Sequence, residues 1–390
     1  MKTRFFDEQK LEGNFIDLPY GSYTFAQLSA LISQIKSINI PPRAKVTLYA
    51  QDNFRSNRHV IANTGNKNLK VTGFEREFPF AVRSLMIECA CKLDRNPEVE
   101  LRIIKDDFKR NNQIVAYTFY QVIPEPLDDP LAAPSPFNPT ILIIPDFGTD
   151  KRIYECLQDI FAQSRFSSIV LDLRGTGQSY SSTSVKYADI IQDYRFIAQQ
   201  LNQYVKKPIL IGHGIGGAIA QLWAITYKFE LRNLILIDSA PYAIYSQYHL
   251  INTQIQQWIN NIITTEQFAT IVANNTYNTI SEDCEVDKLK LDLSSSIINS
   301  DSATLKRLFT QNPDNVALAM SPKTILTPTL LMHGLQDAVT SITGTDNLFA
   351  LIKGAKQRRI NTSHSPHLTT QSRAVEAILY FLSPEGNLYI

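Results

Sequence analysis

Glycine is scarce in this chain of 390 residues. The sequence contains 15 glycines, about 4%, against a usual share of roughly 7%. Four of these glycines nevertheless lie within six residues, at positions 212, 214, 216 and 217. This crowding makes residues 212–217 the first place to look for a functional site.

Cysteine and charge are also limited. Four irregularly spaced cysteines do not predict a disulfide scaffold, and no Cys/His spacing indicates zinc. Charged residues make up 19% of the chain, and 38 Lys+Arg against 37 Asp+Glu give a net charge of +1. This balance argues against a nucleic-acid-binding surface or a basic membrane-binding face.

Long apolar runs are missing as well. No run approaches the 18 residues that a membrane-spanning helix needs, and the charged start, residues 1–8, lacks the apolar core of a secretory signal. We therefore expect a cytoplasmic protein in a reducing setting. With 44% hydrophobic residues, the chain can form one large or two ordinary domains.

Two regions with different patterns follow one another along the chain. Residues 10–92 contain short alternating segments separated by turn residues, which predicts a small all-β sandwich. Further on, short apolar segments alternate with helical patterns and predict an α/β fold, a doubly wound and mostly parallel sheet covered on both faces. The expected strands are 141–144, 169–171, 209–211, 234–237 and 330–332, and the expected helices are 151–163, 187–204, 215–228 and 372–382.

Residues 241–325 interrupt this alternation. They have a helical, amphipathic pattern with Trp258 and several tyrosines, and their length is typical of a cap inserted over an active site. The basic segment 356–359 has a plainer interpretation, a solvated stretch.

The glycine cluster lies between an expected strand and an expected helix. Residues 211–217 read Ile-Gly-His-Gly-Ile-Gly-Gly. The letters fit a dinucleotide fingerprint, but this strand comes too late in its domain, and a phosphate-binding loop is excluded because no lysine follows. The third interpretation is the nucleophile elbow G-x-S-x-G, with Gly214 where the serine should stand.

Four further motifs support the elbow. Residues 141–148 end in Pro-Asp-Phe-Gly, residues 171–179 read Leu-Asp-Leu-Arg-Gly-Thr-Gly-Gln-Ser, residues 331–337 read Leu-Met-His-Gly-Leu-Gln-Asp, and residues 363–368 read Ser-His-Ser-Pro-His-Leu. In this order and spacing, residues 97–386 resemble the α/β-hydrolase superfamily with a helical cap.

The resemblance implies catalytic roles for particular residues. Asp337 would be the acid and His364 the base, and the backbone N–H groups of Phe147 and Ile215 would form an oxyanion hole. Two departures matter. Gly214 removes the nucleophile, and Pro145-Asp146 replaces the family's His-Gly.

Other polar residues near the elbow have weaker interpretations. His213 is expected to pack rather than to react, Asp238 is at best an alternative acid, and Cys156 has no histidine nearby in sequence. No metal or cofactor is implied.

The N-terminal region resembles the βγ-crystallin family. Residues 16–23 read Ile-Asp-Leu-Pro-Tyr-Gly-Ser-Tyr, and Tyr49 is followed by Phe54 and Ser56, as in that family's corner motif. The stretches that would supply calcium ligands lack acidic oxygens, so calcium is not expected. We expect this region to contribute stability, dimerisation or docking.

Three functions remain open from the sequence. The first is an enzyme that uses His364 and Asp337 on a small, apolar, carbonyl-containing substrate, either to activate water or to form an enolate. The second is a non-catalytic binding or scaffold protein. The third is an ordinary serine hydrolase in which Gly214 is an engineered replacement of serine.

Overall fold

The computed structural model describes most of the chain. The described residues are 3–18, 21–40, 44–51, 58–63, 68–72, 81–89, 99–110, 113–123, 139–179, 185–201, 205–242, 248–278, 286–310 and 322–383. The chain divides into two compact units. One comprises Met1–Asp94 with Asp287–Ser295, and the other comprises Arg95–Val286 with Ser296–Ile390.

The N-terminal unit contains two antiparallel four-stranded sheets. One has the order β2-β1-β4-β7 and the other the order β3-β8-β5-β6. Apolar side chains from both sheets form one buried cluster that includes Phe5, Ile38, Val46 and Leu85. This arrangement agrees with the expected small all-β region. Its strands are β1 (Thr3–Phe6), β2 (Phe15–Leu18), β3 (Gly21–Tyr23), β4 (Ser37–Ile40), β5 (Ala44–Tyr49), β6 (Arg58–Asn63), β7 (Leu69–Thr72) and β8 (Ser84–Cys89), with helix α1 (Phe25–Ser29) between β3 and β4.

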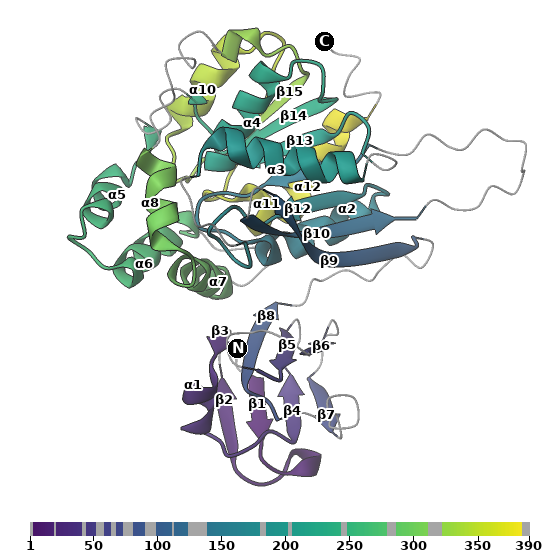
Figure 1. The fold of residues 1–390 in the computed structure, drawn as a ribbon, viewed down its shortest axis with the longest axis vertical. Helices are drawn as coiled ribbons and strands as arrows, with labels where there is room; N and C mark the ends of the chain where they lie inside the picture. Colours follow the sequence, from purple (N-terminus) through teal and green to yellow (C-terminus); the bar gives the residue numbers. More distant parts are fainter. Residues whose placement is uncertain are drawn as a thin grey trace, which may run out of the picture. The chain divides into compact units, whose positions relative to one another are not determined.

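The larger unit is built on an eight-stranded sheet with the order β16-β15-β14-β13-β11-β12-β10-β9 (Figure 1). The run from β12 through β11 to β16 is parallel, whereas β9 and β10 pair antiparallel at one edge. This is the doubly wound, mostly parallel sheet that the sequence predicts. Its strands are β9 (Leu101–Arg110), β10 (Gln113–Val122), β11 (Ile141–Ile144), β12 (Ser168–Leu171), β13 (Ile209–His213), β14 (Asn233–Ile237), β15 (Thr329–Gly334) and β16 (Lys356–Ile360).

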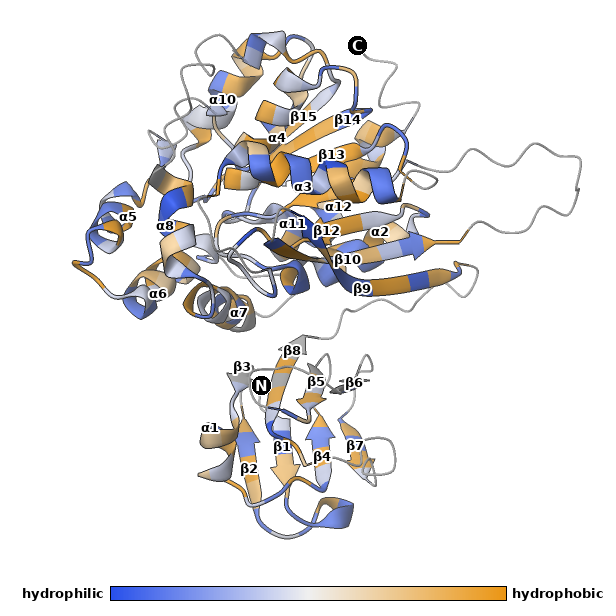
Figure 2. Cartoon of the chain, in the orientation of Figure 1, coloured by the Kyte–Doolittle hydropathy of each residue, from blue (hydrophilic) through white to orange (hydrophobic). Residues whose placement is uncertain are grey.

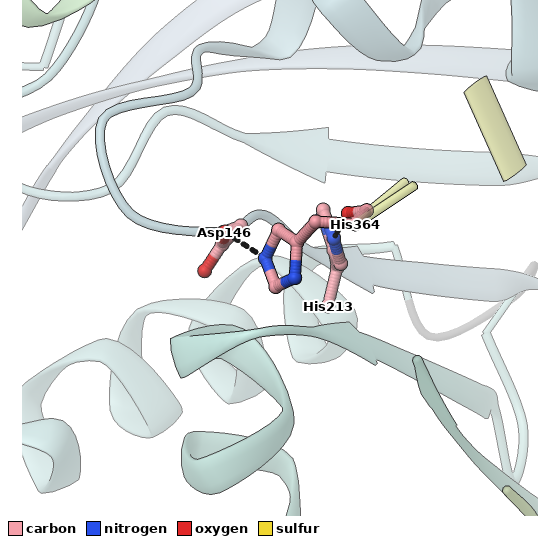
Figure 3. Close-up of side chains that lie close together, drawn as sticks. All are labelled: Asp146, His213 and His364. Atoms are coloured by element: carbon pink, nitrogen blue, oxygen red, sulfur yellow. Dashed lines mark hydrogen bonds and ion pairs between the residues drawn. The ribbon is translucent and has the colours of Figure 1, made fainter. Parts of the chain in front are cut away.

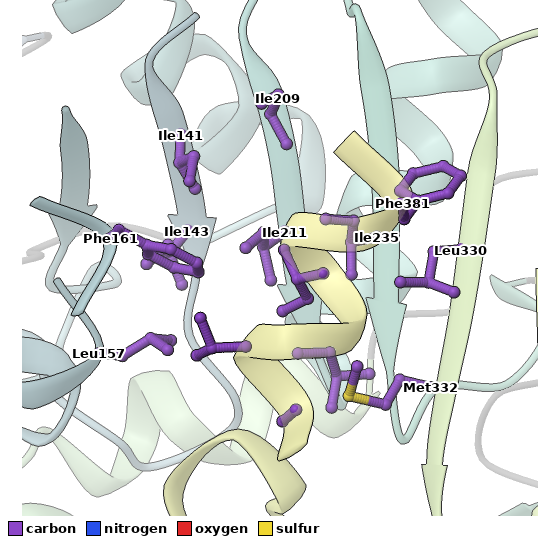
Figure 4. Close-up of a cluster of buried hydrophobic side chains, with 14 of the residues drawn as sticks. Ile141, Ile143, Leu157, Phe161, Ile209, Ile211, Ile235, Leu330, Met332 and Phe381 are labelled. Atoms are coloured by element: carbon purple, nitrogen blue, oxygen red, sulfur yellow. The ribbon is translucent and has the colours of Figure 1, made fainter. Parts of the chain in front are cut away.

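Helices cover both faces of this sheet. Helices α2 and α12 pack on one face, where their apolar side chains meet those of β11 and β13–β15 (Figure 4). Helices α3 and α4 pack together, and α4 contacts β11, β13 and β14 (Figure 1). Strands buried on both faces are necessarily apolar throughout, which explains the continuous hydrophobic colouring of the inner strands in Figure 2. The helices are α2 (Glu155–Gln163), α3 (Tyr187–Gln200), α4 (Ile215–Thr226), α10 (Ile342–Leu351), α11 (Pro366–Thr369) and α12 (Gln371–Leu382).

Both edges of the sheet carry charged strands. The basic segment expected to be a solvated stretch is strand β16, paired with β15, and β9 is rich in Lys, Arg and Asp. Charged side chains on an edge strand discourage pairing with other chains. The solvated stretch expected at 356–359 is thus an edge strand, in which Arg358 and Arg359 are exposed.

Between β14 and β15 the described chain is helical, as expected for 241–325. Its helices are α5 (Asn252–Ile259), α6 (Thr265–Thr276), α7 (Val286–Ile298) and α8 (Ser302–Thr310). Residues 243–247, 279–285 and 311–321 of this segment lie outside the described residues. The role of the segment as a cap stays a prediction.

Two further expectations concern the chain's surroundings. Within the described residues, no helix is long and apolar enough to cross a membrane. Cys156 on α2 is disulfide-bonded. The cysteines are therefore not all free thiols, whereas a reducing setting would predict that they are.

Candidate active site

The glycine cluster forms a sharp turn from strand to helix. Strand β13 ends at His213, Gly214 follows with φ 52° and ψ −117°, and helix α4 begins at Ile215. A side chain at this positive φ is strained. Gly216 has a different reason to be glycine, because a Cβ there would lie 2.3 Å from the carbonyl oxygen of Ile144 on the neighbouring strand.

The space beside Gly214 is occupied by another residue. A Cβ built on Gly214 would lie 1.9 Å from Oδ1 and 2.3 Å from Cγ of Asp146. Asp146 belongs to the loop after β11, where the family has His-Gly. The two departures in the sequence are thus spatially one feature, since the carboxylate of Asp146 fills the volume that a side chain at 214 would need.

His364 and Asp337 lie in contact, as the sequence predicts. Both follow strands at the carboxyl edge of the sheet, Asp337 after β15 and His364 after β16. His364 Nδ1 lies 2.7 Å from Asp337 Oδ2. The other oxygen, Oδ1, accepts hydrogen bonds from the backbone N–H groups of Val339 (2.7 Å) and Thr340 (2.9 Å). These bonds fix the carboxylate that orients the imidazole.

The opposite edge of the imidazole contacts Asp146. His364 Nε2 lies 3.0 Å from Asp146 Oδ2, the interaction drawn as a dashed line in Figure 3. The N–H of Ile215, an expected oxyanion donor, donates to Asp146 Oδ1 at 2.8 Å. Asp146 therefore links the imidazole of His364 to the N–H of Ile215 beside Gly214.

This arrangement places one imidazole between two carboxylates. Burial disfavours the charged form of His364, but Asp337 and Asp146 raise its pKa well above the usual value. Burial likewise disfavours the charged form of Asp146, yet the neighbouring imidazoles of His213 and His364 and the Ile215 N–H lower its pKa to about 2. At neutral pH His364 is an imidazolium and Asp146 is a carboxylate.

His213 positions this pair. Burial lowers its pKa to about 4, so the ring is neutral near pH 7. Nε2 lies 2.9 Å from the carbonyl oxygen of His364 and must carry the proton. Nδ1 then accepts from the hydroxyl of Tyr154 at 3.2 Å, and that hydroxyl accepts the N–H of Asp146 at 3.1 Å. The packing role expected for His213 thus includes a hydrogen-bonded link between the loop of Asp146 and the loop of His364.

Asp238 is not the acid. Its Oδ1 accepts the N–H of Gly334 at 2.8 Å, and it lies 3.5 Å from His333 Nδ1. Burial and the nearby Asp337 carboxylate raise the pKa of Asp238 well above the usual value. The histidine bonds to Asp337 instead.

Solvent reaches this cluster at one side chain. The side chains of His213, Asp238, His333, Asp337 and His364 are at most 1% exposed, whereas that of Asp146 is 12% exposed. A molecule that approaches the cluster from solvent meets Asp146 first.

The cluster also contains two sets of side chains with metal-ligand character. The ligand atoms of Asp146, His213 and His364 lie within 4.8 Å of one another, as do those of Asp238, Asp337 and His364. In each set, however, His364 is bonded directly to a carboxylate. Its partner is Asp146 in the first set and Asp337 in the second. The carboxylates of Asp146 and Asp337 that a metal would need are therefore already partnered by His364.

Phe147 connects the loop after β11 to the inserted helices. Its ring centroid lies 4.2 Å from that of Phe309 on α8 and 6.0 Å from those of Trp258 on α5 and Phe268 on α6. The expected oxyanion role of its backbone N–H stays a prediction. The sequence did not place Asp146 in this cluster, although its replacement of the family's glycine was the available signal.

The parallel sheet, the elbow at 214 and the Asp337–His364 pair together define an α/β-hydrolase. The chain belongs to the family described as serine aminopeptidase, S33, whose family model matches residues 136–370. A solved hydrolase from Pseudomonas aeruginosa is similar in fold, with a TM-score of 0.57 and 17% identity over 74% of this chain and 100% of that one.

Curated relatives match shorter stretches. Development-specific protein S of Myxococcus xanthus is 42% identical over 65 residues, which is 16% of this chain and 37% of the relative. Epoxide hydrolase 4 of mouse is 34% identical over 91 residues, 23% of this chain and 25% of the relative. The chain thus spans well under half the length of these relatives.

Proposed function

We propose that this protein is an enzyme that hydrolyses a small apolar substrate without a serine nucleophile, with His364 as the acid–base group and Asp337 as its orienting partner. The observation that carries the proposal is the placement of the His364 imidazole, 2.7 Å from Asp337 and beside the elbow at Gly214. An imidazole held in this way donates a proton to a leaving group and then accepts one from water.

Hydrolysis fits the site better than the enolate chemistry that the sequence left open. An enolate needs free N–H donors at the oxyanion position, and the N–H of Ile215 is already bonded to Asp146. Attack by water on a saturated carbon, as in an epoxide, requires no such donors, whereas hydrolysis of an ester carbonyl requires them too.

The engineered-variant hypothesis is less well supported. A serine at 214 would collide with Asp146, because a Cβ there would lie 1.9 Å from Oδ1. A simple serine-to-glycine change in an ordinary hydrolase would not bring a carboxylate into that space.

The test is a substrate panel of p-nitrophenyl esters, lactones and epoxides. We expect turnover by the unaltered protein and a loss of roughly 10²–10⁴-fold in His364→Gln, with thermal unfolding showing that the variant is folded. His59→Gln in the N-terminal unit is the matched control and keeps full activity. Turnover that survives His364→Gln would contradict the proposal. Binding without turnover would favour the scaffold alternative.

A further inference from the structure

We propose that His333 is a positioning residue of this site, whose unprotonated Nε2 lies beside the Asp337 carboxylate and helps to keep His364 in its charged form. His333 is on β15, four residues before Asp337, and its side chain is fully buried. It acts on His364 only through Asp337. The inference about the imidazoles stands by itself, and its consequence for the reaction rests on the proposed function.

One oxygen of Asp337 lies near two imidazoles. His364 Nδ1 is 2.7 Å from Oδ2 and donates a hydrogen bond to it. His333 Nε2 is 3.5 Å from the same oxygen, which is longer than an ordinary hydrogen bond. Among the described residues this nitrogen has no hydrogen-bond partner. What His333 presents to Asp337 therefore depends on whether Nε2 carries a proton.

The hydrogen bonds at the other ring nitrogen decide where the proton lies. His333 Nδ1 is 2.8 Å from the hydroxyl oxygen of Thr345 on α10. That hydroxyl has a single proton, which it donates to the carbonyl oxygen of Ser239 at 2.8 Å. Toward His333 the hydroxyl can therefore only accept, so Nδ1 carries the proton.

The ring of His333 is neutral near pH 7. Burial lowers its pKa to about 4, and the charge of His364 contributes to this lowering, although the carboxylates of Asp337 and Asp346 oppose it. A neutral imidazole has only one protonated nitrogen. Since that nitrogen is Nδ1, Nε2 keeps a lone pair beside the Asp337 carboxylate.

This lone pair favours positive charge on the other side of Asp337. The partial negative charge of Nε2 disfavours the nearby carboxylate and favours a cation next to it, and in a buried place the interaction is weakly screened. The cation is the imidazolium of His364. Nε2 thus adds to the two carboxylates, of Asp337 and Asp146, that raise the pKa of His364.

A purely structural histidine would be expected to carry the other tautomer. A proton on Nε2 would give Asp337 one more donor, and a buried acceptor that lacks a donor is destabilising. The hydroxyl of Thr345 prevents this gain, because it accepts from Nδ1. The arrangement therefore favours the charge of His364 over the most stable surroundings for Asp337.

The proposed reaction needs this charge. An imidazolium can donate the proton that a leaving group requires, so the enzyme works only while His364 keeps its proton. We expect His333 to set the upper limit of the working pH range. The titratable groups around the two rings are Asp238, Asp337, Asp346, Asp146 and His213, and they are left unchanged in the variants below.

Nitrogen NMR of the histidine rings tests the tautomer without any substrate. In the unaltered full-length protein the nitrogen-15 shifts distinguish a protonated ring nitrogen from an unprotonated one. We expect His333 to carry its proton on Nδ1 at neutral pH. In Thr345→Val the hydroxyl is gone, and we expect the proton to move to Nε2, where Asp337 can accept it. A proton on Nε2 of the unaltered protein would overturn the proposal.

Two substitutions separate the two nitrogens of His333. His333→Asn keeps an N–H donor near the place of Nδ1 and removes Nε2, whereas His333→Gln puts an amide NH2 near the place of Nε2 and reverses its polarity. We expect the pKa of His364, followed in the same spectra, to fall in His333→Asn and to fall further in His333→Gln. His59→Gln in the N-terminal unit is the control and leaves it unchanged.

An unchanged titration of His364 in both variants would show that His333 only packs. If these variants do not fold, as judged by thermal unfolding, Thr345→Val decides, because its shift of the tautomer must also lower the pKa of His364.

Rates separate this inference from the proposed function. On a panel substrate that is turned over, the upper limb of the pH profile of kcat should move to lower pH in His333→Gln, by the shift that NMR measures for His364. If no substrate is turned over but the order of pKa values is observed, the proposed function fails and the role of His333 stands. If turnover depends on His364 while its pKa is equal in all variants, the proposed function stands and the role of His333 fails.

Discussion

Two carboxylates lie on opposite edges of one imidazole, and they differ in almost everything else. The side chain of Asp337 is 1% exposed, and its second oxygen is held by two backbone N–H groups. Asp146 is 12% exposed, and its second oxygen is held by the N–H of Ile215 at the start of α4. The Asp337 carboxylate is enclosed by its own loop, whereas the Asp146 carboxylate is slightly exposed beside the elbow.

We infer different roles for the two carboxylates from this difference. A carboxylate fixed by backbone donors sets the tautomer and direction of the imidazole. A carboxylate at the solvent edge can meet a substrate. The distances to His364, 2.7 Å and 3.0 Å, do not by themselves reveal the distinction, but the exposure and the second-oxygen partners do.

Neutralising Asp337 tests the orienting half and has the largest expected effect. In Asp337→Asn the amide oxygen still accepts the two backbone hydrogen bonds, but the amide NH2 cannot accept the hydrogen bond from His364 Nδ1–H. The imidazole then loses the proton at Nδ1 and keeps the one at Nε2. We expect kcat on the panel substrate to fall roughly 10⁴-fold, with KM nearly unchanged, in initial-rate measurements.

The matched control is Asp346→Asn, which neutralises an exposed carboxylate paired with Arg359 and leaves kcat intact. A loss of less than tenfold in Asp337→Asn would show that Asp337 does not orient the imidazole.

Rebuilding the elbow tests whether Asp146 and residue 214 share one space. Gly214→Ser alone places a side chain at φ 52° against Asp146, which costs about 1–3 kcal/mol of strain and about 1–3 kcal/mol of overpacking. The double variant Gly214→Ser with Asp146→Gly removes the collision. Chemical denaturation should show the second change recovering the overpacking cost.

Covalent labelling with a fluorophosphonate checks the same pair. We expect no labelling at residue 214 in the unaltered protein or in Gly214→Ser, and His364-dependent labelling in the double variant. Equal stability losses in the single and double variants would mean that the two positions are independent.

Local patterns were sufficient to predict much of this molecule. Continuous apolar runs predicted the inner strands β11 and β13–β15, since a strand buried on both faces is apolar along most of its length. The order of the motifs placed Asp337 and His364 together, because parallel strands end at one edge of the sheet. The expected small β region is also present.

What the sequence could not give was the contact between Asp146 and Gly214, which are 68 positions apart. Each departure was visible, but only the pairing of β11 with β13 brings their following loops together. The edge strands β9 and β16 were not predicted. Their charged side chains reflect exposure at the edge of the sheet, and they do not form the apolar pattern that predicts a strand. The βγ-crystallin resemblance stays a prediction, and its residues Pro19, Phe54 and Ser56 lie outside the described residues.

The smallest expected effect concerns how the free energy of unfolding depends on pH. It tests the contact between Asp146 and the imidazole of His364. The pKa of Asp146 is lowered to about 2. Its contribution to folding stability is therefore complete above the ordinary carboxyl pKa of about 4 and is lost as the pH falls toward 2. The pKa of His364 is raised, so its contribution is complete below about 6.5 and is lost as pH rises through the raised value.

The Asp146–His364 pair therefore stabilises the fold most between about pH 4 and pH 6.5. In Asp146→Asn we expect a loss of about 1–3 kcal/mol in that window, shrinking toward both extremes, measured by urea unfolding across pH. Because Asp146 raises the pKa of His213, the difference between the two proteins at the acidic end includes this histidine as well. NMR titration of the His364 ring should show its pKa lowered in the variant, because one of its two carboxylate partners is gone. An unchanged His364 titration would mean that the contact between Asp146 and His364 does not persist in solution. Asp337 would then be the one carboxylate of the two that acts on the imidazole.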